Sequence, residues 1–519
     1  MEKKEISFIK AEPKARLIAF TPKAYDLSVA SARTCYSPEL IELDSVTEGQ
    51  RERIGKLIYE AGHHTPFQHP FFVFGLENVS RQLVWSFLHS HPFFNSDQSS
   101  QRYNVLEQAK VFVPEMNAEQ EKIFKKAVMN AWNSYNELSS KLFDAVMPSV
   151  KAIGKIKAQS EKKMISEAEK KAVEWARYVL PVASYTCLYH AVNGITLQRY
   201  IKMMNSSDAP EEAKIVVKQM IEEIKKIDAD FIERIENKEF GEKELIEEKL
   251  NEKVASNSEK FAEEFDSFLD GKISKLRSST PEAEKVLAES VRGVLALTKE
   301  DLPDEKAVSM VLNPKENPYL LETLNVWAHS PLMRSLFNVN FCFYTKISHA
   351  GDSQNQRHRG TPASRPLLFR HITSKPDFII PEVMHKTPEI KELYLNAINS
   401  LWNARNELID SGLNEKSANY LLPNATSIRL IESGQLIHWL HKWRMRTCFN
   451  AQSEIWMASM QQLEQVREKH PLIANFIGPP CFTRKGSVEE KELEGPCPEG
   501  AHWCGVKVWL NYPKVKRIW

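Results

Sequence analysis

A dense cationic cluster, Arg357-His358-Arg359, stands near the middle of the second half of the chain. The alternating residues 341–347 before it predict a half-buried strand. That strand would deliver Gln354, Arg357 and Arg359 to one place. Arg presents a planar fork of donors and stays charged at any working pH, so the cluster could bind a phosphate or the electron-rich edge of a flavin. Taken alone, the tripeptide is also compatible with a solvated basic turn.

A second polar stretch, residues 95–104, carries the same kind of chemistry in the first half of the chain. Ser100, Gln101 and Arg102 supply a hydroxyl, an amide and a guanidinium within three consecutive positions. Together with backbone N–H groups, these are the donors that a phosphate group requires. An ordinary turn stabilised by Asn and Ser side chains is the alternative interpretation.

The composition describes a globular protein of ordinary kind. The chain has 519 residues, 42% of them apolar and 26% charged, which favours two or more domains. A formal net charge of +1 argues against a protein that coats nucleic acid or a membrane surface. We find no apolar run long enough to span a membrane and no secretory signal, and seven cysteines are too few for a disulfide scaffold. We therefore expect a cytoplasmic location, with no nucleic-acid or membrane partner.

Short strands and long helices are predicted to position these residues. Apolar segments predict strands at 16–20, 71–76 and 110–115, and helical periodicity predicts helices at 118–147, 163–181 and 192–204. Residues 206–280 are rich in Lys and Glu, with apolar residues near helical spacing. This pattern is typical of an amphipathic helical insert that packs outside a core.

The second half of the chain repeats the first. The segment 132–138, Trp-Asn-Ser-Tyr-Asn-Glu-Leu, recurs at 402–408, and the segment 176–181 recurs at 418–423. Two weaker echoes fall in the same order, so we interpret the chain as an internal duplication rather than a solenoid. We expect a first repeat at 1–225, an insert at 226–280, a second repeat at 281–480 and a Cys/His tail at 481–519.

Several motifs in both halves of the chain resemble those of the flavin-dependent thymidylate synthase family. The hallmarks are an Arg-His-Arg cluster, a Ser-x-Arg-Tyr loop and a His-x-Thr-Pro-Phe-x-His loop. They also include an Arg-x-x-Leu-Pro helix, an Asn downstream of it, and a late helix with an Arg followed by Ala-Gln-x-Glu. The first half keeps residues 63–69, Ser100–Tyr103, Arg177 and Asn193. The second half keeps Gln354, the Arg-His-Arg cluster, Arg446 and residues 451–455.

The resemblance implies an α+β fold, in which two tandem repeats each pack a twisted sheet with long helices. It implies the reductive methylation of dUMP to dTMP, with FAD as cofactor and with methylenetetrahydrofolate and NADPH as co-substrates. By similarity, FAD would be held by His63, Thr65, Gln68, Asn193, Arg357, His358 and Arg359. By similarity, dUMP would be held by Gln354, Ser100, Gln101, Arg102, Arg177 and Arg446. Arg357 and Arg446 would be the catalytic residues, because they can stabilise negative charge that grows on the base.

Each half lacks motifs that the other keeps. Where Arg-His-Arg is expected, the first half has Trp85-Ser86-Phe87, and Met204 stands in place of the late Arg. In the second half, Asn419 stands where the first has Arg177. Complementary losses predict one composite site that draws on both repeats, and a homodimer that mimics the family's tetramer.

Three departures from the family pattern leave other functions open. Gln68 and Gln98 stand where carboxylates are expected, and Ile195 stands where a basic residue is expected. The alternatives are a folate-dependent hydroxymethylase of pyrimidine nucleotides on the same scaffold, and a non-catalytic protein that binds flavin or nucleotide.

The tail contains a possible metal site. Cys481, Cys497, His502 and Cys504 fall close together in the sequence, and three Cys with one His form an accepted set of zinc ligands. Their spacing matches no standard zinc finger, so unliganded thiols are the alternative.

Overall fold

Two four-stranded antiparallel sheets form the centre of the molecule. The structure is a computed structural model, and it describes residues 6–204, 209–234, 246–487 and 497–517. The first sheet has the strand order β2-β3-β6-β4, with the bounds β2 (Lys14–Phe20), β3 (Phe71–Ser80), β6 (Tyr185–Asn193) and β4 (Asn95–Gln98). The second has the order β7-β8-β10-β9, with the bounds β7 (Ser274–Ser279), β8 (Asn340–Ser348), β10 (Ser427–Gln435) and β9 (Ala363–Ser364).

The two sheets have the same topology. In each, the first, second, fourth and third strands along the chain lie side by side in that order. A further parallel pair, β1 (Phe8–Lys10) and β5 (Ala109–Val111), lies outside both sheets. One unit has therefore been built twice, as the repeated segments predicted, and the α+β fold class is confirmed.

Helices flank the sheets and follow the same duplicated plan. In the first half they are α1 (Ala24–Thr34), α2 (Glu48–Gln50), α3 (Lys56–Glu60), α4 (Arg81–Ser90), α5 (Ala118–Ile156), α6 (Glu161–Ala176), α7 (Gly194–Met203), α8 (Glu211–Lys225) and α9 (Ala229–Glu233). Next come α10 (Ile246–Lys253), α11 (Ser258–Leu269), α12 (Ala283–Leu295), α13 (Asp304–Leu312), α14 (His349–Asn355) and α15 (Leu368–His371). The last are α16 (Pro388–Asp410), α17 (Glu415–Ala418), α18 (Leu436–Arg446), α19 (Ser453–Lys469), α20 (Pro471–Ala474), α21 (Pro480–Gly486) and α22 (Val508–Asn511).

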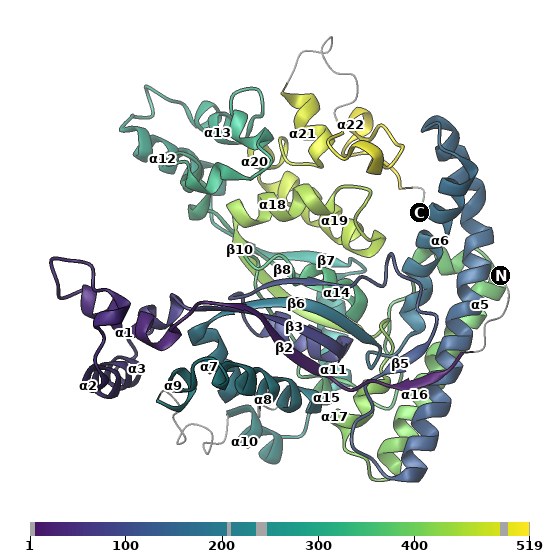
Figure 1. The fold of residues 1–519 in the computed structure, drawn as a ribbon. Helices are drawn as coiled ribbons and strands as arrows, with labels where there is room; N and C mark the ends of the chain where they lie inside the picture. Colours follow the sequence, from purple (N-terminus) through teal and green to yellow (C-terminus); the bar gives the residue numbers. More distant parts are fainter. Residues whose placement is uncertain (1–5, 205–208, 235–245, 488–496, 518–519) are drawn as a thin grey trace.

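The sheets lie between two pairs of equivalent helices. In Figure 1, α18 and α19 lie over the second sheet, and α7 and α8 lie beneath the first. The long helices α5, α6 and α16 stand together at the side of both sheets. None of the helices in the described ranges is both long and apolar enough to cross a membrane.

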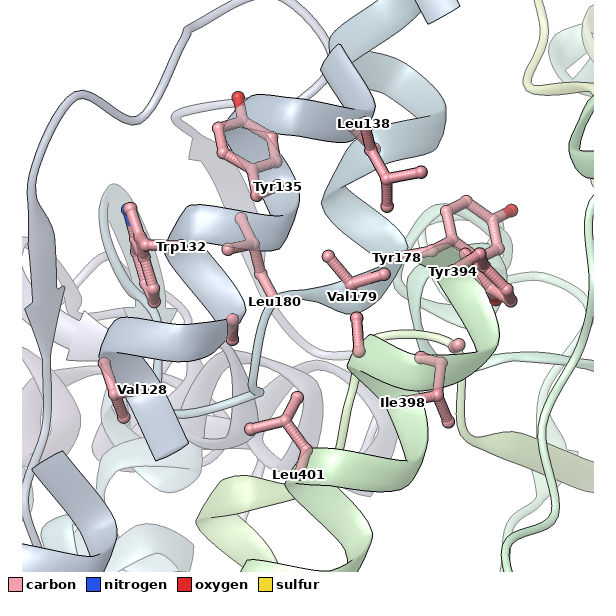
Figure 2. Close-up of a cluster of buried hydrophobic side chains, with 14 of the residues drawn as sticks. Val128, Trp132, Tyr135, Leu138, Tyr178, Val179, Leu180, Tyr394, Ile398 and Leu401 are labelled. Carbon is pink, nitrogen blue, oxygen red and sulfur yellow. The ribbon is translucent and has the colours of Figure 1, made fainter. Parts of the chain in front are cut away.

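The largest apolar cluster joins the two repeats. Val128, Trp132 and Leu138 of α5 belong to the same buried cluster as Ile398 and Leu401 of α16 (Figure 2). Because each helix supplies one stripe of this shared core, neither repeat would bury its own stripe alone.

A short seam of backbone hydrogen bonds runs between the repeated Leu-Pro segments. Val182 N–H donates to the carbonyl of Leu422 at 2.8 Å, and Asn424 N–H donates to the carbonyl of Leu180 at 2.8 Å. Pro181 and Pro423 form an antiparallel bridge between them. These reciprocal pairs are the contacts expected of two copies related by a local two-fold axis.

Two buried carboxylates repeat this symmetry. Glu212 accepts hydrogen bonds from the Ser80 N–H and hydroxyl, and Glu454 accepts from the same two groups of Ser348. Each also receives a Tyr hydroxyl from the other repeat: Tyr178 O–H donates to Glu454 at 2.7 Å, and Tyr420 O–H donates to Glu212 at 3.5 Å. The seam therefore fixes the starts of α4 and α14, the helices that follow Ser80 and Ser348.

The charged insert packs on the second repeat. Phe265 of α11 stacks on Tyr344 of β8, and Asp266 forms ion pairs with Lys346 and Arg429. Residues 235–245 of the insert lie outside the described residues. Since β7 joins the second sheet, we propose that the second repeat starts at Ser274 rather than after residue 280.

Candidate active site

A cavity of about 310 Å³ lies where the two repeats meet, and we call it the arginine cavity. Its lining residues come from both halves of the chain and include Arg81, Gln98, Ser100, Gln101, Arg102, Tyr103, Arg177, Ser353, Gln354, Arg357, Asn424, Arg446, Pro480 and Glu499. All of the residues predicted to bind the nucleotide are among them. The volume lies in the range of sites for small organic ligands.

The ends of secondary-structure elements position the arginines. Arg102 lies in the loop after β4, and Arg177 follows the last residue of α6. Arg446 is the last residue of α18, and Arg357 lies just beyond α14. Segments far apart in the sequence thus converge because the shared core and the seam hold the two repeats together.

A buried carboxylate orients Arg102. The Arg102 Nε donates to Glu174 Oε2 at 2.8 Å, and its Nη2 donates to the backbone carbonyl of Asn450 at 2.9 Å. With its amide oxygen turned toward the guanidinium groups, Gln354 accepts from Arg102 Nη1 at 3.0 Å and from Arg446 Nη1 at 3.3 Å. One second-repeat amide therefore bridges arginines from both repeats.

The cavity has more positive charge than its carboxylates balance. Five arginines line it, and Glu499 is the one acidic residue among its described lining residues. Burial lowers the pKa of Arg81 to about 9, and burial, with help from Arg102 and Arg357, lowers the pKa of Arg446 to about 10. Cations that are buried without enough counter-charge favour an anionic ligand.

Several polar atoms in the walls have no partner. Arg81 Nε, Gln98 Oε1 and Gln101 Nε2 are buried and make no hydrogen bond in the described part of the chain. Buried donors and acceptors are normally satisfied, so these atoms point to a polar ligand. Sequence reasoning missed Arg81, because the first residue of a predicted helix after an apolar strand gives no sign that it faces a cavity.

Arg357 and Arg359 reach from the second repeat to strand β4 of the first. Arg357 Nη2 donates to the carbonyl of Ser96 at 3.1 Å and approaches Asp97 Oδ1 at 3.3 Å. Arg359 donates to the carbonyls of Pro92 and Phe94 and to Asn95 Oδ1, the last at 3.0 Å. The two arginines therefore contact different points of β4 and the loop before it.

His358 lies between them but points elsewhere. Its Nε2 accepts from Arg446 Nε at 2.7 Å, and its ring lies beside that of His441. Burial, then the charge of Arg446, holds the pKa of His358 well below its usual range, so the ring is neutral and can accept this bond. His358 thus orients Arg446 toward the arginine cavity.

The residues predicted to hold FAD in the first repeat lie outside the arginine cavity. His63, Thr65 and Gln68 are exposed in the loop before β3, and Asn193 caps α7 by accepting from Thr196 N–H at 3.0 Å. Gly194 lets this loop pack on α7, since a Cβ there would meet the carbonyl of Phe67 at 2.8 Å.

The loop and the Arg-His-Arg cluster meet at one end of the first sheet. Phe71 pairs with Asn193, and Asn95, the partner of Arg359, pairs with Ala191 two positions earlier on β6. The arginine cavity begins at the other end of β4, where Gln98 lines it. Arg357, which contacts the middle of β4, therefore lies between the two groups.

The equivalent location across the seam is filled. Trp85 stands at the position equivalent to Ser353, counted from the helix-capping Ser80 and Ser348. Its ring packs on His349, with centroids 5.1 Å apart, and its Nε1 donates to the buried Asp352 at 2.7 Å. Asp352 also forms an ion pair with Arg365. In the described part of the chain, the arginine cavity is thus open, and Trp85 fills the equivalent location.

The same count corrects one sequence alignment. His89 and Arg357 follow Ser80 and Ser348 by the same number of residues, so His89-Ser90-His91, not Trp85-Ser86-Phe87, corresponds to the Arg-His-Arg cluster. The helix caps fix this register, which spacing alone could not. Asn419 stands where the first repeat has Arg177. Its side chain accepts a hydrogen bond from Arg405 Nε at 2.7 Å within the second repeat.

The predicted tail site is not assembled as expected. His502 is exposed, while Cys481, Cys497 and Cys504 line a small cavity together with Cys448. In the described part of the chain, no three His, Cys, Asp or Glu side chains already stand in an arrangement that could hold a metal ion. The predicted ligand His502 therefore does not lie with the three cysteines at this cavity.

Fold and site together define a duplicated α+β protein with one cationic, ligand-sized cavity between its repeats. The family model described as "Thymidylate synthase complementing protein" matches residues 16–228 and 275–472. The chain therefore belongs to this family, the flavin-dependent thymidylate synthases, and it carries the family unit twice. The family is one of methyl-transferring enzymes that depend on a flavin.

Curated relatives carry the same name. A flavin-dependent thymidylate synthase of Clostridium tetani is 30% identical over 220 residues, which cover 41% of this chain and 83% of the relative. One from Geobacter sulfurreducens is 29% identical over 175 residues, 33% of this chain and 68% of that protein. A solved structure described as a UMP/dUMP methylase, PolB from Streptomyces cacaoi bound with 5-Br dUMP, has a TM-score of 0.34 and 17% identity, and covers 44% of this chain and 96% of its own.

Proposed function

We propose that this protein converts dUMP to dTMP in the arginine cavity, using methylenetetrahydrofolate as the one-carbon donor and NADPH as the reductant. The observation that carries the proposal is the convergence of Arg102 and Arg177 from one repeat with Arg357 and Arg446 from the other. A nucleotide monophosphate would supply the negative charge that these arginines need as a partner. Its uracil would offer a carbonyl to the unpartnered Gln101 Nε2 and an N–H to the unpartnered Gln98 Oε1.

Ser100, Gln101, Arg102, Arg177 and Arg446 would hold the phosphate and sugar. The guanidinium groups of the three arginines are already oriented by protein partners. Glu174 orients Arg102, Gln452 orients Arg177 through a hydrogen bond of 2.8 Å, and His358 orients Arg446. Preorganised donors lose little freedom when the ligand binds, which favours affinity.

Arg357 would act on the base. It is exposed, lies between the arginine cavity and the predicted flavin residues, and is held only by Ser96 and Asp97 of the described residues. A fixed positive charge beside the uracil carbonyls stabilises the negative charge that develops on the ring during methylation. Gln354, three positions earlier, would fix the orientation of the base.

His63, Thr65, Gln68 and Asn193 would hold FAD, together with His358 and Arg359. The bound flavin supplies the hydride chemistry, for which no side chain is suited. In a single chain these first-repeat residues lie on an open surface, so we propose that a second copy in a homodimer completes the wall of the flavin site.

The function is tested by anaerobic turnover. Protein loaded with FAD, dUMP, methylenetetrahydrofolate and NADPH should form dTMP, identified by product mass, and Arg357→Ala should lose turnover. A product with the mass of 5-hydroxymethyl-dUMP would instead support the hydroxymethylase. If the flavin-loaded protein forms neither product, the proposed enzymatic function is wrong.

A further inference from the structure

Four of the seven cysteines meet at one small cavity beside the arginine cavity, and we call it the thiol cavity. Cys448, just after α18, Cys481 on α21, and Cys497 and Cys504 in the tail all line it. The other three cysteines lie elsewhere, and none of the seven forms a disulfide. Thiols from three separate segments converge here, which ordinary apolar packing does not require.

The size and walls of the thiol cavity suit a single ion. Its volume of about 10 Å³ corresponds to one water-sized atom. The remaining lining residues are Phe449, Pro479, Pro480, Pro498, Glu499, Trp503 and Val508, so sulfur is the prevailing ligand atom. Thiolate ligands favour zinc over Mg²⁺ and Ca²⁺, which require several oxygen ligands.

We propose that Cys448, Cys481, Cys497 and Cys504 bind one structural zinc ion. Tetrahedral sites of four Cys ligands are an accepted structural zinc geometry, with Zn–S distances of about 2.3 Å. The four thiols do not stand in a coordinating arrangement in the described structure, so the proposal requires their side chains to change rotamer when the ion binds. Compared with the ligand set expected from sequence, Cys448 replaces the exposed His502.

The ion would fasten the tail to the wall of the arginine cavity. Cys448, Pro480 and Glu499 line both cavities. Zinc would therefore tie Cys481, Cys497 and Cys504 to the end of α18, next to Arg446. Zinc content and dUMP turnover are measured separately, so the zinc site can be present whether or not the protein carries out the proposed reaction.

Metal analysis of the full-length protein tests the site. After expression with zinc and gel filtration, elemental analysis should find about one zinc ion per chain. Cys448→Ser should lose it, whereas His502→Ala should retain it. Cys342→Ser is the matched control, because Cys342 is also half-buried but lies in β8 away from the cavity.

Wild-type protein provides a second measurement in case the Cys448 variant fails to fold. A strong chelator should release about one zinc ion per chain and make further thiols reactive toward a thiol reagent. Wild-type protein without zinc, or with iron in its place, would overturn the site. Zinc that stays bound in Cys448→Ser, or leaves in His502→Ala, would overturn this ligand set.

Discussion

At the scale of single residues, the arginine cavity depends on how each guanidinium is held. Burial opposes the charge of Glu174, but the cations Lys171, Arg102 and Arg517 outweigh it and lower the pKa of this carboxyl to about 2. Glu174 is therefore ionised at any working pH and keeps Arg102 fixed by charge-assisted hydrogen bonds. His358, held neutral by its surroundings, does the same for Arg446.

Removing an arginine from either repeat should weaken dUMP binding. Arg446→Ala should cost roughly 1.5–3 kcal/mol, about tenfold to a hundredfold in Kd measured by calorimetry. Arg102→Ala should do the same, and is best combined with Glu174→Gln so that no buried carboxylate loses its partner. Arg444→Ala on the same helix is the control, because Arg444 lies over Trp327 and does not line the cavity.

One result would contradict the composite site. If the Arg102 and Arg177 variants leave dUMP affinity and turnover unchanged while Arg357→Ala abolishes both, the site belongs to the second repeat alone.

At the scale of elements, the seam between the repeats is held by buried polar groups as well as by apolar helices. Glu212 and Glu454 each bind the serine that caps a helix in their own repeat, Ser80 or Ser348, and each accepts a Tyr hydroxyl from the other repeat. Gly351 has no side chain because a Cβ there would meet Glu454 Oε2 at 2.8 Å. The seam thus fixes how α14 approaches the arginine cavity.

The pH dependence of stability should reveal Glu212. Burial raises its pKa from about 4.5 to about 7, so the folded protein holds a proton that the unfolded chain releases. The contribution of protonated Glu212 to the free energy of unfolding is fully present below about pH 4.5. It is lost as the pH rises through 7, which lowers the free energy of unfolding by about 3 kcal/mol. Glu212→Gln should therefore gain stability relative to wild type between pH 5 and 8, measured by denaturant unfolding.

A neighbouring substitution provides the comparison. Glu222 lies exposed on the same helix, so Glu222→Gln should differ from wild type by the same amount at both pH values. A Glu212→Gln curve parallel to wild type would show that this carboxyl does not titrate as described.

At the scale of the whole molecule, duplication has allowed the two copies to specialise. One junction keeps the arginine cavity, and its twin is filled by Trp85, His349 and the Asp352–Arg365 pair. A homomeric enzyme must place every functional residue on every copy, but each repeat here need keep only what it contributes to one junction. Because each repeat contributes to one functional junction only, each could lose the motifs that the other repeat keeps.

We predict one nucleotide per chain, with each site contained in one chain. Titration of the flavin-loaded protein with dUMP should give a stoichiometry of about one per chain, because the twin location is filled. Mixing inactive Arg102→Ala and Arg446→Ala chains should restore no activity, since both arginines of a cavity belong to the same chain. Recovery of about a quarter of the activity in mixed dimers would show instead that sites are shared between chains.

The sequence by itself determined the duplication, and the family resemblance that it carries implied the fold class. It also predicted six of the residues that line the arginine cavity: Ser100, Gln101, Arg102, Arg177, Gln354 and Arg446. Repeated segments such as 176–181 and 418–423 are local strings, and apolar periodicity records which face of each element is buried. The helix α7 was therefore predictable close to its observed bounds. The strand β3 and the helix α5 begin at the predicted residues, but both extend beyond the predicted ends at residues 76 and 147.

Only the tertiary structure decided which distant groups meet. Arg81 faces the cavity, Trp85 fills the twin location, and Cys448 rather than His502 joins the tail thiols. None of these follows from local pattern, because each depends on packing between segments separated by long stretches of chain. The register of the Arg-His-Arg cluster was also settled this way, since the buried Glu212 and Glu454 fix where each helix begins.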